Sequence, residues 1–281
     1  MSRKDFFRRE AQDMLPAWRT WHEELSLQSV HASEWIAELA NVRAGMSVLD
    51  LASGIGDPAL VLARRVGAGG LVTATDLVPE GLTLLERRAQ LLRLSAIRTR
   101  CADMEYLPFP GASFDAATCR LGLMFCDEPA RALSEVRRVL KPGARAAFVV
   151  WGSPQQPLFE STLGELGEVG GESDALSVEE AQPGPFRFAR ASSLAELVRH
   201  AGFSNVVEES RVLPWPFHGT GCELWTMFKE LAGPSFERCL AWLDDAARRE
   251  LDARVATKLD RFRRDGVVDP TALLIGCSGV A

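Results

Sequence analysis

The stretch Val48-Leu49-Asp50-Leu51-Ala52-Ser53-Gly54-Ile55-Gly56-Asp57-Pro58 decides the fold of this chain. An apolar run over residues 46–51 predicts a buried strand, which stops at small residues before a helical pattern begins. Gly54 and Gly56 let a ligand approach the backbone closely, and the free N–H groups of a helix start would face that ligand. Asp50 places a carboxylate at the end of an apolar strand, which is costly without a partner. The stretch therefore predicts a site for a nucleotide-like ligand.

Composition limits the classes of protein to consider. With 281 residues, 47% of them hydrophobic and 25% charged, the chain is long enough for one large domain with an appended cap. A net charge of −6 argues against nucleic acid as a partner, because phosphates are neutralised by basic surfaces. No secretory segment or run of membrane-spanning length is recognisable, so we expect a cytoplasmic protein without a membrane span. The six cysteines form no Cys-x-x-Cys pair, and we expect no metal site.

Strand-like and helix-like segments alternate from Gly45 onward. Strands are predicted over 46–51, 71–75, 97–101, 114–119 and 145–151, with helices over 57–66, 79–92 and 128–140 between them. Such alternation over short loops is typical of a parallel, doubly wound sheet. Ligands of these sheets bind where the strands end, at their carboxyl edge. Each of the first three predicted strands ends on or beside an acid, namely Asp50, Asp76 and Asp103.

Helical segments flank this core, which we place at 45–152. Residues 1–44 carry apolar side chains at helical spacing and predict an N-terminal helical lid. Residues 153–190 show little periodicity and are expected to form a connecting lid. Residues 191–281 are expected to complete the sheet, with a helix over 191–201, strands over 205–212 and 271–280, and a turn over 214–219. A helical cap insertion is predicted over about 213–268.

Two interpretations of the glycine turn compete. Asp76 lies 20 positions after Gly56, and an acid about that far past such a turn binds ribose hydroxyls in nucleotide-binding sheets. The alternative for Asp76 is a turn or N-cap carboxylate. Gly54-x-Gly56-x-x-Ala59 also satisfies the dinucleotide fingerprint, so an NAD(P)-dependent oxidoreductase is a competitor. Asp50, just before the turn, would repel a pyrophosphate but suits a cationic ligand.

Residues 50–56, Asp-Leu-Ala-Ser-Gly-Ile-Gly, resemble motif I of class I S-adenosylmethionine (SAM)-dependent methyltransferases, usually D-x-[AG]-x-G-x-G. Asp76 matches the acid that ends their second strand, and residues 102–104 match their adenine-contacting loop. Residues 107–110, 113–115 and 135–143 resemble the subgroup akin to ubiquinone/menaquinone C-methyltransferases. The resemblance covers about residues 45–151. It implies an α/β fold with a Rossmann-like, doubly wound, mostly parallel seven-stranded sheet.

The resemblance also implies a cofactor site for SAM. Asp50 would help to hold the ammonium group of the cofactor, Asp76 would bind its ribose hydroxyls, and Asp103 would accept a hydrogen bond from its adenine amino group. Arg120 and Leu121 would line the cofactor near its reactive end. The complete set of implied cofactor residues is Asp50, Ala52, Gly54, Gly56, Asp76, Leu77, Asp103, Met104, Arg120 and Leu121.

Methyl transfer requires the protein to position the two reactants, to exclude water and to supply a base where the nucleophile loses a proton. His218, in an aromatic turn, is the first candidate base, and His22, in the expected lid, is the second. A surface or structural histidine is the alternative for each. Candidate substrate-binding aromatics, each of which could equally be a core residue, are Trp18, Trp21, Trp151, Trp215, Phe217 and Trp225.

We interpret the chain as a SAM-dependent methyltransferase acting by in-line displacement on a small, apolar or aromatic acceptor. The acceptor could be a quinol precursor or a metabolite of secondary metabolism, methylated at oxygen or carbon. A bacterial origin suits the excess of arginine over lysine, and a monomer or homodimer is expected. The open alternatives are an NAD(P)-dependent oxidoreductase and a non-catalytic methyltransferase-like binding protein.

Overall fold

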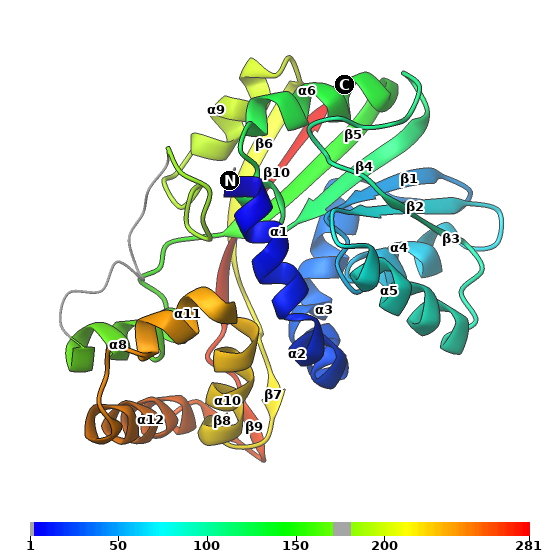
Figure 1. The fold of residues 1–281 in the computed structure, drawn as a ribbon. Helices are drawn as coiled ribbons and strands as arrows, with labels where there is room; N and C mark the ends of the chain where they lie inside the picture. Colours follow the sequence, from blue (N-terminus) through cyan, green and yellow to red (C-terminus); the bar gives the residue numbers. More distant parts are fainter. Residues whose placement is uncertain (1–2, 171–180) are drawn as a thin grey trace.

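A seven-stranded sheet with the strand order β3-β2-β1-β4-β5-β10-β6 forms the centre of the protein (Figure 1). The computed structural model describes residues 3–170 and 181–281. The strands of this sheet are β1 (Ser47–Leu51), β2 (Leu71–Asp76), β3 (Ile97–Cys101), β4 (Phe114–Arg120), β5 (Leu140–Trp151), β6 (Ser204–Leu213) and β10 (Ala272–Val280). A three-stranded sheet in the order β7-β9-β8 is built from β7 (Phe217–His218), β8 (Arg263–Arg264) and β9 (Val267–Val268).

Helices cover both faces of the large sheet, as a doubly wound fold requires. The helices of the described residues, including those of the insertion that lie away from the sheet, are α1 (Arg3–Asp13), α2 (Leu15–Thr20), α3 (His22–Leu39), α4 (Ala59–Val66), α5 (Pro79–Leu91), α6 (Pro129–Val139), α7 (Pro157–Glu160), α8 (Leu163–Gly170), α9 (Ser193–His200), α10 (Gly221–Leu231), α11 (Gly233–Leu240), α12 (Asp245–Asp260) and the 3₁₀ turn η1 (Leu123–Phe125). Helices α3, α4 and α5 pack on one face, and α6 and α9 pack on the other. None of the described helices combines the length and apolar character needed to cross a membrane.

The strand directions confirm a mostly parallel, doubly wound sheet. The pairs β1–β2, β1–β4, β2–β3 and β4–β5 are parallel, whereas β10 runs antiparallel to both β5 and β6. Parallel neighbours end at the same edge, so the chain segments that follow β1, β2, β3 and β4 meet there. The register places Asp50 beside Thr118, and Arg120 follows two positions later on the same face of β4. This carboxyl edge carries the sequence-predicted site.

The apolar pattern explains why these segments form these elements. Strand β1 is buried along its length after its first residue, because it lies between β2 and β4 and is covered by helices on both faces. Helix α6 buries a stripe of residues spaced three and four apart, Ala132, Leu133, Val136 and Val139, against the sheet. The leucine and valine side chains of this stripe each contribute roughly 1.5–3 kcal/mol when fully buried.

Several expected boundaries differ from the structure. The helix predicted from residue 57 begins at Ala59, with Pro58 as its N-cap residue. Strand β5 begins at Leu140, not at 145, because Leu140 already pairs with Phe114. The register then shifts, and regular pairing resumes between Ala116 and Arg145. The predicted turn over 214–219 contains β7, whose pairing with β9 depends on a segment about 50 residues away that local periodicity does not reveal.

The connection predicted over 153–190 contains helices α7 and α8 in its first part. Their buried side chains, Leu158, Phe159, Leu163 and Leu166, recur at helical spacing, so the sequence did carry a helical signal there. Residues 171–180 of this predicted segment lie outside the described residues. The remainder of the segment returns to the sheet and reaches α9.

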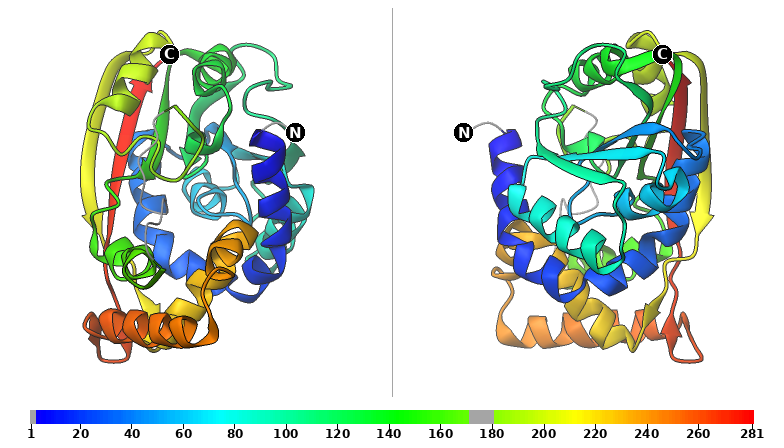
Figure 2. Two further views of the ribbon diagram at one scale, coloured as in Figure 1. Left: turned by 60° about the vertical axis from the view of Figure 1, so that its left-hand side comes forward. Right: turned by 90° about the vertical axis from the view of Figure 1, so that its right-hand side faces the viewer.

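Helices α10, α11 and α12 and the small sheet lie between β6 and β10 in the chain. The orange α12 is at the end of the molecule opposite the C-terminus (Figure 2). Helix α11 lies beside α1 although the two are far apart in sequence. An ion pair of 3.2 Å joins Arg238 to Glu10, and the indole N–H of Trp21 donates to Glu230 over 2.6 Å. The N-terminal helices and the insertion therefore contact each other.

Candidate active site at the carboxyl edge of the sheet

Asp50 is a fully buried carboxylate in the last part of β1. Its Oδ1 accepts a hydrogen bond of 2.6 Å from the hydroxyl of Thr118 on β4. Its other oxygen, Oδ2, is buried and has no hydrogen-bond partner. Burial raises the pKa of Asp50 to about 7, although the Thr118 hydrogen bond opposes that shift. An unpaired buried oxygen of this kind is costly and indicates a missing donor.

Arg120 supplies the complementary charge at the end of β4. Its Nη2 donates to the backbone carbonyl of Asp57 over 2.7 Å, while its Nε is buried without a partner. Burial lowers the pKa of Arg120, and the nearby carboxylates of Asp57 and Asp50 counteract this shift. One unpaired carboxylate oxygen and one unpaired guanidinium N–H therefore occur close together at the carboxyl edge. An α-amino acid group, with its ammonium and its carboxylate, is complementary to this pair.

Asp76 fixes the glycine turn to the end of β2. Its Oδ2 accepts from the backbone N–H of Gly54 over 2.8 Å, and its Oδ1 accepts from that of Val78 over 2.9 Å. Desolvation raises the pKa of Asp76 despite these hydrogen bonds. Gly54 and Gly56 have φ angles of 51° and 122°, a region that favours glycine. These two hydrogen bonds show that Asp76 acts as a turn carboxylate, which was the alternative interpretation. The binding of ribose by Asp76 stays a prediction. Leu77 follows, half-buried.

The loops after β1, β3 and β4 meet at Gly122. A Cβ atom placed on Gly122 would lie 2.4 Å from the Cβ of Ala52 and 3.6 Å from the Cε of Met104. Ala52 and Leu121 have φ angles of 51° and 58°, and such strained conformations cluster at functional sites. The structure therefore brings together Ala52, Met104 and Leu121 from three predicted loops. Gly122 was not among the residues predicted from the sequence, where a glycine three positions after the predicted strand over 114–119 is the signal.

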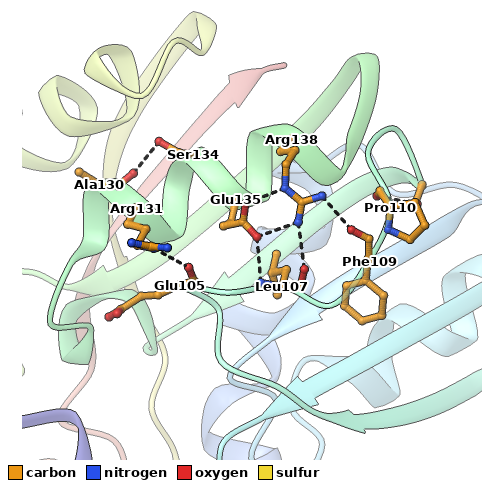
Figure 3. A network of polar contacts seen from close by, with 10 residues as sticks. Glu105, Leu107, Phe109, Pro110, Ala130, Arg131, Ser134, Glu135 and Arg138 are labelled. Atoms are coloured by element: carbon orange, nitrogen blue, oxygen red, sulfur yellow. Dashed lines mark hydrogen bonds and ion pairs between the residues drawn. The ribbon is translucent and has the colours of Figure 1, made fainter.

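The loop that carries Asp103 is held by a network of polar contacts with α6 (Figure 3). Asp103 accepts from the backbone N–H of Glu105 over 2.9 Å. The carboxylate of Glu135 accepts from the N–H of Leu107, and Arg138 donates to the carbonyl of Leu107, over 2.9 Å each. Residues 107–110 and 135–143 resembled the same subgroup of methyltransferases, and their contacts position the loop beside β4.

The two candidate histidines occupy different environments. His22 begins α3, and its Nδ1 is buried without a partner. One turn later, Ser26 donates to the carboxylate of Asp57 in the glycine turn over 2.7 Å. His218 is exposed in β7, opposite Val267, and none of its described contacts joins it to the residues of the carboxyl edge. The turn of α3 that begins at His22 therefore reaches the glycine turn through Ser26, whereas no described contact links His218 to that turn.

Two aromatic groups lie near this edge. Trp151, the last residue of β5, has its ring centroid 5.2 Å from that of Trp215 and 5.0 Å from that of Phe159. Trp21 lies 6.3 Å from Phe217 by the same measure. These contacts unite candidate substrate residues from the N-terminal helices, the sheet and the insertion.

Trp18 and Trp225 are placed differently. A Cβ atom on Gly81 would lie 3.8 Å from Cζ3 of Trp18 and 3.2 Å from the carbonyl oxygen of Gly54, so Trp18 lies close to the glycine turn. Trp225 is 1% exposed, stacks on Phe228 and donates its indole N–H to Asp252 over 2.6 Å. The contacts of Trp225 are those of a core residue of the insertion.

A carboxyl-edge site complementary to an α-amino acid, on a doubly wound sheet, is the arrangement expected of the SAM-binding class of proteins. Residues 49–148 match a family described as a methyltransferase domain. The chain is 40% identical over 120 residues to the ubiquinone/menaquinone biosynthesis C-methyltransferase UbiE of Ralstonia nicotianae, covering 42% of this chain and 49% of the relative. It is 35% identical over 176 residues to UbiE of Cupriavidus necator, covering 59% of this chain and 71% of the relative.

The chain belongs to the class I SAM-dependent methyltransferases, in the UbiE-like subgroup, and SAM is the cofactor of this class. It spans about half the length of the first curated relatives that it matches. The crystal structure of the YcgJ protein of Bacillus subtilis has the same fold, with a TM-score of 0.56 and 20% identity over 89% of this chain and 97% of that one. In the parts of the chain described, no group of three or more acids, histidines or cysteines could hold a metal ion.

Proposed function

We propose that the protein transfers a methyl group from SAM to a small, apolar or aromatic acceptor. The observation that carries this proposal is the pair of unpaired, buried polar atoms, Oδ2 of Asp50 and Nε of Arg120. The methionine end of SAM carries an ammonium and a carboxylate group, which would satisfy both atoms. A nicotinamide cofactor has no such group, and its pyrophosphate would face the Asp50 carboxylate. The pair therefore favours SAM over NAD(P).

In this proposal, the residues of the carboxyl edge bind SAM and orient it. Bound SAM supplies an electrophilic methyl group. Asp50 and Arg120 hold its amino-acid end, the backbone at Gly54 and Gly56 packs against it, and Asp76 binds the ribose. Residues Leu77, Asp103 and Met104 contact the adenine, while Ala52 and Leu121 line the reactive end. Positioning of this kind accounts for a large part of the rate of a two-substrate displacement.

The aromatic groups support the acceptor class. Trp215 and Phe217 are buried in the apolar core, whereas Trp21 and Trp151 pack against them and are only partly buried, so these two tryptophans are the candidates for contact with an aromatic ring. The UbiE relatives are named for ubiquinone and menaquinone biosynthesis. A quinol-type ring, methylated at carbon, is an acceptor that could pack against these aromatic side chains. Methylation at oxygen is the alternative outcome, for which we assign His22 as the candidate base because its Nδ1 is buried and unpaired.

Calorimetric titration with two compounds related to SAM tests this proposal. S-adenosylhomocysteine contains the amino-acid end of SAM, and 5′-methylthioadenosine lacks it. We expect the wild-type protein to bind the former at least tenfold more tightly, and Asp50→Asn with Arg120→Gln to remove that preference. Each lost charged contact corresponds to roughly 1.5–3 kcal/mol. Binding of NAD(P) without binding of S-adenosylhomocysteine would contradict the proposal.

Turnover separates an enzyme from the non-catalytic alternative. Incubation with methyl-labelled SAM and a panel of quinols, naphthols and their aliphatic analogues should transfer label to an aromatic member of the panel. Tight binding of S-adenosylhomocysteine without transfer to any extractable small molecule would favour a binding protein.

A further inference from the structure

We propose that Arg88 couples the N-terminal helices to the glycine turn, so that cofactor binding and the docking of α3 stabilise one another. The inference rests on the proposed function, because it concerns how the cofactor site is assembled. No described interaction joins Arg88 to Asp50 or Arg120, the residues proposed to hold the amino-acid group of the cofactor. It is a positioning residue, which acts through Asp57.

Arg88 projects from α5 and is 8% exposed. Its Nη1 donates to the carbonyl oxygen of Ile55 over 2.6 Å and to the carboxylate of Asp57 over 3.1 Å. Its Nη2 donates to the hydroxyl of Ser26 on α3. That hydroxyl in turn donates to the same Asp57 carboxylate over 2.7 Å. One guanidinium therefore holds the backbone and a side chain of the glycine turn and also one turn of α3.

Asp57 connects this cluster to the proposed cofactor residues. Its carboxylate accepts from Arg88 and Ser26, while its backbone carbonyl accepts from Arg120 over 2.7 Å. The position of Asp57 therefore fixes where the Arg120 guanidinium lies relative to Asp50. Because the Asp57 and Arg88 side chains are only 9% and 10% exposed, water screens this ion pair little. Loss of Arg88 would leave the Asp57 carboxylate to attract Arg120 away from the cofactor.

A second, separate contact joins the N-terminal helices to the same turn. Trp18 on α2 and the carbonyl of Gly54 both lie beside Gly81 of α5, since a Cβ atom on Gly81 would be 3.8 Å from the Trp18 ring and 3.2 Å from the Gly54 oxygen. The turn is thus approached by α2 through an aromatic ring and by α3 through a hydroxyl. Since a coupling between two sites is reciprocal, a cofactor that orders the turn must also stabilise the docked position of these helices.

Hydrogen exchange with and without saturating S-adenosylhomocysteine tests the coupling. In the wild-type protein, we expect the analogue to slow exchange over 53–58 and over the first two turns of α3. Arg87→Met is the matched control, because Arg87 is the exposed neighbour of Arg88 on the same helix. This control should keep both effects. Arg88→Met should lower the affinity for the analogue at least tenfold and remove the slowing in α3 at saturation.

Ser26→Ala separates coupling from a general loss of structure. It removes the hydroxyl that joins α3 to Asp57 but keeps the Arg88 contacts with the turn. We expect it to retain affinity within about threefold while losing the slowing in α3. Arg88→Lys keeps the charge without the forked geometry and should behave as Arg88→Met does, more weakly.

The outcomes are distinguishable. If S-adenosylhomocysteine does not bind the wild-type protein, the proposed function fails. If it binds but leaves exchange in α3 unchanged, or if α3 is still protected in Ser26→Ala, the coupling through Arg88 is wrong while the proposed function stands. Should Arg88→Met fail to fold, the Ser26→Ala and Arg88→Lys results decide the inference.

Discussion

A buried carboxylate whose pKa lies near neutrality makes the cofactor site depend on pH. Burial raises the pKa of Asp50 from its ordinary value of 3.8 to about 7, so the group is partly protonated at pH 6–7 without ligand. A ligand ammonium favours the charged carboxylate and lowers this pKa. We therefore expect S-adenosylhomocysteine binding at pH 6.5 to release a fraction of a proton, and affinity to rise from pH 6 to pH 8.

Calorimetry in buffers of different ionisation enthalpy measures this proton release. Asp50→Asn, which keeps the shape of the side chain but cannot titrate, should remove the pH dependence of affinity between pH 6 and pH 8. An equal proton release in this variant would assign the titration to another group.

Gly122 sets how closely the loops after β1 and β4 approach. Gly122→Ala would place a Cβ atom 2.4 Å from that of Ala52 and 3.0 Å from the sulfur of Cys119, so at least one loop must move. We expect affinity for S-adenosylhomocysteine to fall at least tenfold, as measured by calorimetry. Gly167→Ala is the control, because its added Cβ meets nothing within 4 Å in α8. Unchanged affinity in Gly122→Ala would mean that the loops are free to separate without disturbing the site.

At the scale of elements, the helices of the insertion pack around Trp225, which belongs to the same apolar core as α3, α4 and α5. The ring lies 5.6 Å from Phe228 and 5.9 Å from Phe236, and its N–H bonds Asp252 of α12. Trp225→Ala should cost about 3–5 kcal/mol of unfolding free energy by leaving a cavity. Urea unfolding measures this loss, and affinity for S-adenosylhomocysteine should change less than threefold. Trp242→Ala, at a tryptophan that is 90% exposed, should leave both quantities unchanged.

The elements that sequence could predict are those with a local signal. The first five strands and the helices between them follow from apolar periodicity and turn residues, and their order places Asp50, Asp76 and Asp103 at one edge before any contact is known. Strands β7, β8 and β9 were all missed, because such two-residue strands exist only through pairing with one another, which no local pattern encodes. Helices α7 and α8 were masked by neighbouring Pro and Gly residues.

The residues of the candidate site also fall into those that the sequence predicts and those that only the three-dimensional packing reveals. Motif spacing predicts Asp50, Gly54 and Asp76, whereas Arg88 and Ser26 reach the glycine turn from other helices. Their role depends on three-dimensional packing, since a buried arginine and an exposed one look alike in sequence. His218 stood out in the sequence because of its aromatic neighbours, yet its side chain is exposed in β7.

For the whole molecule, a ligand that binds only the folded state raises stability by mass action. S-adenosylhomocysteine at 100 times its dissociation constant should stabilise the fold by about 2.7 kcal/mol. For a chain of this size that corresponds to a rise in Tm of about 5 °C. Differential scanning fluorimetry measures this shift, and NAD(P) at the same concentration should produce none. A shift with NAD(P) alone would support the oxidoreductase alternative.

Strand β10 comes last in chain order among the strands but lies inside the sheet, between β5 and β6. During synthesis, β1 to β5 can pair as soon as they leave the ribosome, whereas β6 has no neighbour in the sheet until β10 has followed the insertion. The insertion must therefore fold, or at least fold back, before the sheet can close. A nascent chain stalled before residue 272 would present the free edges of β5 and β6, which are surfaces that chaperones recognise and that favour aggregation.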